Sequence, residues 1–179
     1  ILVDDRRGVP PNAFQTLDRN GRPVIGFTSA LIADARNQHE LAFVFAHEAA
    51  HQWFYGVVGN DQLLEPWLDE ALSTYCERLY YEKQQPLGLD WWWAYRINYY
   101  NPQGWVDGSI YNPQGYRAYR DAVYLNGANF LEDLRGLIGD DAFFAFLKAY
   151  SQKFSQRIAT SSDFFALLGE FSREDLSPL

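Results

Sequence analysis

Two histidines and a glutamate in the segment His47-Glu48-Ala49-Ala50-His51 have the types and the spacing of a metal site. Residues four apart lie on one face of an α-helix, so the imidazoles of His47 and His51 can bind the same metal ion. Glu48 lies about 100° around the helix from His47, where it can stand beside an open position of the metal without binding it. The segment therefore indicates a metal ion with a general base next to it.

A third ligand is needed, because a catalytic zinc ion takes three protein ligands and a water molecule. His39 lies eight residues before His47, and we expect it to be exposed at the start of the helix. Glu70 follows His51 after 18 intervening residues. Pro66 suits the first position of a second helix, so Glu70 and His51 would each lie about one turn from the connection between two neighbouring helices. The spacing therefore predicts that Glu70 completes the site.

The elements that position these side chains are helices, because the apolar pattern takes a helical period from Asn37 onward. Apolar residues three and four apart predict a first metal-binding helix over residues 38–56 and a second over 66–84. Thr160 and Asp163 have the spacing of a capping box before the last helix. The other helices are expected over residues 117–136, 140–153 and 164–171.

Residues 1–35 show extended rather than helical signals. Asn20-Gly21 suits the tight turn of a hairpin between strands at residues 14–17 and 24–32. We expect a small antiparallel sheet there, followed by a helical part over residues 37–179 with about five or six helices. The sequence therefore predicts an α+β fold.

The segment over residues 86–116 is dense in Trp, Tyr, Asn, Pro and Gly. Frequent Pro and Gly residues are typical of a long loop, in which the aromatic rings mainly serve packing. The alternative is that the rings form an aromatic wall beside a cleft. The sequence leaves both interpretations open.

Composition excludes several classes of protein. The chain has 179 residues, 47% of them hydrophobic and 21% charged, so it can form a core and is not disordered. A net charge of −8 without a basic run excludes nucleic acid as a partner, and a single cysteine excludes a disulfide framework. No apolar run is long enough for a membrane span in this chain. It does not begin with Met, and we expect it to be a fragment of a longer protein whose localisation stays open.

The pattern His47-Glu48-x-x-His51 followed by Glu70 is that of the gluzincin metallopeptidases. Its flanks, at residues 46–56 and 67–70, resemble the M1 aminopeptidase family. The run Tyr124-Leu125-Asn126-Gly127-Ala128 is similar to Tyr-x-Lys-Gly-Ala of that family, and the resemblance covers about residues 38–170.

This resemblance implies a thermolysin-like zincin catalytic domain over residues 1–179, hydrolysing peptide bonds with one Zn²⁺. It implies zinc binding by His47, His51 and Glu70, with Glu48 as general base and then general acid. Tyr124 corresponds to the tyrosine that hydrogen-bonds the tetrahedral oxyanion. A peptide or protein would be the substrate, and an upstream β-domain of the parent protein would be a further partner.

Two more residues match family positions. Tyr119 matches a second tyrosine seen in some members, although its surroundings in the sequence favour a core tyrosine. Glu77 matches a recurrent glutamate seven residues after Glu70, on the same helix face, where it could orient a zinc-bound histidine. The alternative for Glu77 is a solvated or helix-pairing carboxylate.

The resemblance has one departure. M1 aminopeptidases carry Gly-x-Met-Glu-Asn, whose glutamate holds the free amine of the substrate, and the matching stretch over residues 17–23 lacks it. The opening Pro11-Asn12-Ala13-Phe14 looks more like the M48 endopeptidases. An aminopeptidase, an endopeptidase and a non-catalytic zinc-containing binding module therefore remain alternatives. The retained Glu48 argues against the last of these, because binding needs no general base.

Overall fold

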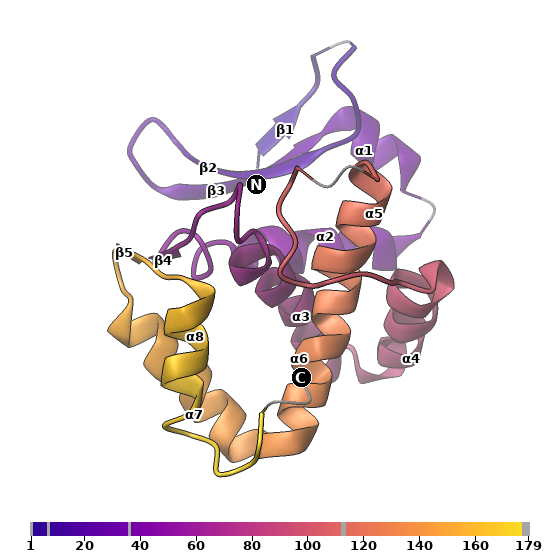
Figure 1. The fold of residues 1–179 in the computed structure, drawn as a ribbon. Coiled ribbons are helices and arrows are strands. Elements are labelled where there is room, and N and C mark those ends of the chain that lie inside the picture. The colour runs from indigo at the N-terminus through magenta and orange to yellow at the C-terminus, as the bar shows by residue number, and fades with distance from the viewer. Residues whose placement is uncertain (1, 7, 36, 112–113, 177–179) are drawn as a thin grey trace.

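The computed structural model describes residues 2–6, 8–35, 37–111 and 114–176. Helix α2 (Gln38–Ala50) packs against both a small sheet and helix α3 (Trp67–Gln84), and further helices surround α3 (Figure 1). This arrangement confirms the expected α+β fold. Among the described residues, no helix combines the length and the apolar character needed to cross a membrane.

The sheet has the strand order β1-β3-β2, with β1 at Leu2–Asp4, β2 at Ala13–Leu17 and β3 at Pro23–Thr28. The antiparallel prediction is confirmed for β2 with β3 and is wrong for β1, which pairs with β3 in parallel. The hairpin leaves one edge of β3 free, and β1 occupies that edge in the same direction as β3. β1 and β3 are separated in the sequence by β2, so their parallel pairing leaves no local signal.

The hairpin turn lies at the predicted Asn20-Gly21. Gly21 has φ of +74°, a conformation that glycine adopts without steric cost. The Asp18 carboxylate accepts the backbone N–H groups of Asn20 and Arg22, which closes the turn.

The second predicted strand, residues 24–32, was too long. β3 ends at Thr28, and helix α1 (Ser29–Asp34) follows it directly. The Thr28 hydroxyl accepts the N–H of Leu31 as an N-cap, which starts a helix where the apolar pattern suggested a continuing strand.

Helix α2, the first predicted metal-binding helix, begins at Gln38 directly after its N-cap Asn37, as expected, but it ends at Ala50 rather than near residue 56. The chain reverses through a turn in which Gly56 donates to the His51 carbonyl and Tyr55 has φ of 101°. Phe54 is buried in this turn, so its apolar spacing reflects packing of the turn and not further helix. Helix α3 matches the predicted range to within one residue.

The expected loop over residues 86–116 contains a succession of short helices up to Tyr100, so that prediction was wrong for its first half. The expected helix over residues 117–136 is a continuous run with a π-helical segment, η4, in its middle. The elements of this part are η1 (Pro86–Gly88), α4 (Leu89–Trp91), π-helical η2 (Trp92–Ile97), η3 (Asn98–Tyr100), α5 (Tyr116–Arg120), π-helical η4 (Asp121–Asn126) and α6 (Gly127–Ile138).

Helix α7 (Asp140–Lys153) has the predicted bounds, and the predicted capping box of Thr160 and Asp163 is present. The predicted bounds 164–171 of the last helix were three residues too late, because α8 (Ser161–Leu168) begins directly after its N-cap Thr160. Two-residue strands, β4 (Val58–Gly59) and β5 (Arg157–Ile158), pair in parallel and tie the turn after α2 to the segment before α8. Five helices in the described part of the chain reach eight residues or more, in agreement with the expected number: α2, α3, α6, α7 and α8.

Helix α3 is the centre of the core, and η4 and α6 approach it closely. A Cβ added to Gly127 would lie 2.5 Å from the Cβ of Ala71, so only glycine allows this approach. Ala71 follows Glu70 directly, and Gly127 lies three residues after Tyr124. The close contact therefore sets the distance between the segment of Tyr124 and the helix of Glu70.

We predict that Gly127→Ala lowers the free energy of unfolding by about 1–3 kcal/mol, because overpacking forces the two helices apart. Urea unfolding measures the change. Gly136→Ala is the matched control in the same helix, since nothing lies within 4 Å of its added Cβ. The control should gain about 0.5–1 kcal/mol from helix propensity, and equal effects of the two substitutions would contradict the close-contact argument.

Candidate metal centre

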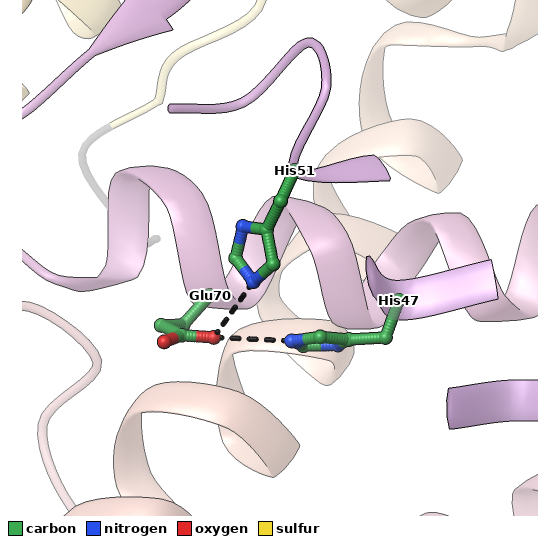
Figure 2. Close-up of side chains that lie close together, drawn as sticks. All are labelled: His47, His51 and Glu70. Carbon is green, nitrogen blue, oxygen red and sulfur yellow. Dashed lines mark hydrogen bonds and ion pairs between the residues drawn. The ribbon is translucent and has the colours of Figure 1, made fainter. Parts of the chain in front are cut away.

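The three predicted ligands converge between α2 and α3 (Figure 2). Glu70 Oε2 lies 3.1 Å from His47 Nε2 and 3.5 Å from His51 Nε2. One donor atom from each of the three residues lies within 4.8 Å of the other two. Two imidazole nitrogens and one carboxylate oxygen form a donor set that suits zinc.

The second nitrogen of each histidine is already engaged. His47 Nδ1 lies 3.0 Å from Glu77 Oε1, and His51 Nδ1 lies 3.2 Å from the Phe54 carbonyl and 3.1 Å from Ser73 Oγ. Acceptors at Nδ1 favour the tautomer whose Nε2 carries a lone pair, and both Nε2 atoms face Glu70. The residues present therefore fit a zinc ion by chemistry as well as by position.

Glu77 has no exposed side-chain surface, which rules out the solvated alternative. Arg96 donates to it through Nε at 2.9 Å and Nη2 at 3.0 Å, and Trp92 Nε1 donates at 2.9 Å. Burial alone would raise the pKa of Glu77, but the Arg96 charge and the contact with His47 bring it below its ordinary value. Glu77 is thus a buried carboxylate that lies in position to orient His47.

Three residues that contact the predicted site were not expected from the sequence: Arg96, Trp92 and Ser73. Arg96 and Trp92 belong to η2, in the segment that was expected to be a loop, and no local pattern connects them with Glu77. Ser73 lies three residues after Glu70. Residues at this spacing share a helix face, so the sequence does carry a signal that places Ser73 near the predicted ligands.

Glu48 follows His47 in α2 and is partly buried. Loss of solvent raises the pKa of its carboxyl above the ordinary value, and the charges of His47 and His51 act in the opposite direction.

His39 lies outside the cluster, as expected, but the expectation that it is exposed was wrong. Its ring stacks on Trp91 with the centroids 4.7 Å apart.

Tyr124 lies against the ligands, whereas Tyr119 lies behind it. The Tyr124 ring stacks on the His47 imidazole with the centroids 5.9 Å apart and the planes 7° apart. Burial, followed by the nearby Glu70 charge, raises the pKa of Tyr124, so its hydroxyl stays protonated and can donate. Tyr119 is buried with its ring edge-on to Tyr124 at 5.8 Å.

The start of α3 is fixed by a second buried carboxylate. Asp69 accepts hydrogen bonds from Asn60 Nδ2 at 2.9 Å and from Gln62 Nε2 at 2.8 Å. Asn60 Nδ2 also donates to the Glu65 carbonyl at 3.0 Å. These bonds hold the loop before α3 against the helical turn that carries Glu70.

This chain is similar in sequence to one protein family and to several aminopeptidases. Residues 22–179 match the peptidase family M1 domain. Aminopeptidase M1-B of Oryza sativa subsp. japonica is 26% identical over 157 residues, which cover 83% of this chain and 18% of that protein. Aminopeptidase N of Lactococcus lactis subsp. lactis is 27% identical over 161 residues, covering 81% of this chain and 18% of that protein.

Solved structures resemble the fold. An M1 zinc metallopeptidase from Deinococcus radiodurans has a TM-score of 0.63 and 26% identity, covering 91% of this chain and 34% of that one. Leukotriene A4 hydrolase from yeast has a TM-score of 0.67 at 22% identity, covering 96% and 28%, and shows likeness of fold alone. The chain spans 18% of the length of the two curated relatives named above.

We predict that Arg96→Gln weakens zinc binding about 10–100-fold, because Glu77 would lose the partner that neutralises it and would hold His47 less firmly. Competition with a chromogenic chelator measures the affinity. Arg117→Gln, which changes an exposed arginine of α5, is the control and should leave the affinity unchanged. Unchanged zinc affinity in a folded Arg96→Gln protein would show that Glu77 needs no such support.

Proposed function

This chain belongs to the peptidase family M1, and we propose that it hydrolyses peptide bonds in a peptide or protein substrate with one Zn²⁺ held by His47, His51 and Glu70. The observation that carries the proposal is the convergence of these three donor groups within 4.8 Å. Glu48 adjoins the ligands in sequence, and the Tyr124 ring stacks on one of them. Ligands, base and hydroxyl donor therefore occur together.

A bound zinc ion would supply a Lewis acid that lowers the pKa of a water molecule to about 7 and polarises the substrate carbonyl. Glu48 accepts the proton of the attacking water and then donates it to the departing amine. The Tyr124 hydroxyl donates a hydrogen bond to the oxyanion that forms at the carbonyl. Glu77 keeps the His47 ring in the orientation and tautomer that binding requires.

The retained base favours catalysis over a binding module that merely contains zinc. A binding role would need the ligands but would tolerate loss of Glu48. Glu48 adjoins His47 in a helix whose next turn carries His51, and the charges of both histidines act on its carboxyl.

We predict that Glu48→Gln lowers the hydrolysis rate by about 10²–10⁴-fold, because amide nitrogen cannot accept the proton of the attacking water. Zinc content should stay at that of the unsubstituted chain, since Glu48 is not a ligand. Hydrolysis of casein and of aminoacyl amides, with and without chelator, gives the rate, and metal analysis gives the zinc content. Full activity of the variant would overturn the proposed role.

We further propose that cleavage occurs at the amino terminus of the substrate, because the relatives named above are aminopeptidases. Internal cleavage is the second candidate, and one observation favours it. Residues 17–23 correspond in position to the amine-binding stretch of the family but lack its motif, and they run from the end of β2 through the hairpin turn to the start of β3. Asp18 is the carboxylate of that stretch, and its Oδ2 is paired with Arg22 Nε at 2.8 Å. Because this carboxylate already has a cationic partner, it is a poor candidate for holding the free amine of a substrate.

Peptides with a free and with an acetylated amino terminus separate the two candidates. If cleavage is terminal, acetylation should abolish hydrolysis, and mass spectrometry should find single released amino acids. If cleavage is internal, both peptides should give the same fragments at similar rates. The first pattern would exclude the endopeptidase candidate, and the second would exclude the aminopeptidase.

A further inference from the structure

A cavity of about 640 Å³ lies between the first half of α2 and the aromatic segment over residues 91–100. We propose that this cavity binds the cationic side chain of a lysine or arginine that is next to the cleaved bond of the substrate. The inference rests on the proposed peptidase function and adds a substrate preference to it. It also favours the aromatic-wall interpretation of the segment.

The cavity adjoins the reacting groups along two helical runs. Val44 lines it one turn before Glu48 on the same face of α2, and Arg120 lines it one turn before Tyr124. One helical turn advances about 5.4 Å, and successive residues of an extended peptide are about 3.3 Å apart. A substrate residue beside the cleaved bond can therefore place its side chain in the cavity.

Aromatic rings form one wall of the cavity: Trp91, Tyr95, Tyr99 and Tyr100. The wall already binds one cation, because the Arg120 guanidinium lies 4.3 Å from the centroid of the Tyr100 ring. Tyr95 and Tyr99 are 60% and 73% exposed, so their faces are open to a ligand. Ring faces attract ammonium and guanidinium groups through their quadrupole.

Among the described residues that line the cavity, the charges favour a cation over an anion. Two arginines line the cavity, but Arg96 is bound to Glu77 and Arg120 is bound to Asp121 at 2.9 Å. Asp34, at the end of α1, adds an exposed carboxylate to the lining. A lysine or arginine side chain would lay its aliphatic stem along the rings and bring its charge toward Asp34.

The test uses matched peptides that carry lysine or norleucine on either side of the cleaved bond, because norleucine has a similar length without the charge. We expect kcat/KM to be at least about tenfold higher for lysine at one of the two positions. Binding of the same peptides to the zinc-loaded Glu48→Gln chain, measured by calorimetry, should show the same preference without turnover.

Variants of the wall separate a cation site from an apolar pocket. The double substitution Tyr95→Leu with Tyr99→Leu keeps apolar surface but removes the rings, and should reduce the lysine preference by about tenfold. Tyr95→Phe with Tyr99→Phe keeps the rings and should retain the preference. Asp34→Asn should lower the lysine preference several-fold, most strongly at low salt. Asp90→Asn and Tyr111→Leu are controls outside the cavity and should leave it unchanged.

Each outcome decides one of the two proposals. Equal affinities and rates for lysine and norleucine, or a preference that survives loss of both rings, would overturn the cation site and leave the peptidase intact. A preference for norleucine would identify an apolar pocket instead. Failure of the unsubstituted chain to cleave any peptide would overturn the proposed function, while binding to the Glu48→Gln chain would still decide the cavity.

Discussion

Glu70 and Glu77, a partly buried and a buried carboxylate on one face of α3, determine which elements pack against this helix. Removing a carboxylate from water is costly unless it is paired and hydrogen-bonded. Glu70 meets the imidazoles of α2, and Glu77 meets Arg96 and Trp92 of η2. The elements on both sides of α3 are therefore held in place by the groups that these two carboxylates require.

His47 connects these two sets of contacts. One ring nitrogen faces Glu70, and the other faces Glu77. Displacement of η2 would thus reach His47, the proposed metal ligand, through Arg96 and Glu77. Arg96 also lines the aromatic cavity. In our proposal, one segment therefore supports the metal centre and recognises the substrate.

The local part of the site could be predicted from the sequence. Helical periodicity alone places His47, His51 and Glu70 near a common loop, and the structure brings their donor atoms together. Pro66 and the capping pair Thr160 and Asp163 are local signals too. The helix after Pro66 has nearly the expected bounds, whereas α8 begins and ends three residues earlier than expected. These features depend on residues close in the chain.

The remaining features depend on contacts between distant residues. Arg96 reaches Glu77 across 19 residues, from a π-helical segment whose aromatic composition suggested a loop. The parallel pairing of β1 depends on which edge of β3 is free, and the end of α2 depends on a turn that buries Phe54. Apolar spacing cannot separate a helix from a turn that packs equally well.

In our proposal, two imidazoles and one carboxylate hold one zinc ion. X-ray absorption spectroscopy of the zinc-loaded chain identifies these ligands, because nitrogen, oxygen and sulfur ligands give different scattering and distances. We expect one zinc per chain with two imidazole ligands, light-atom bonds of about 2.0–2.2 Å and no sulfur, and loss of one imidazole in His51→Ala. A shell that contains sulfur, or one that is unchanged in His51→Ala, would contradict it.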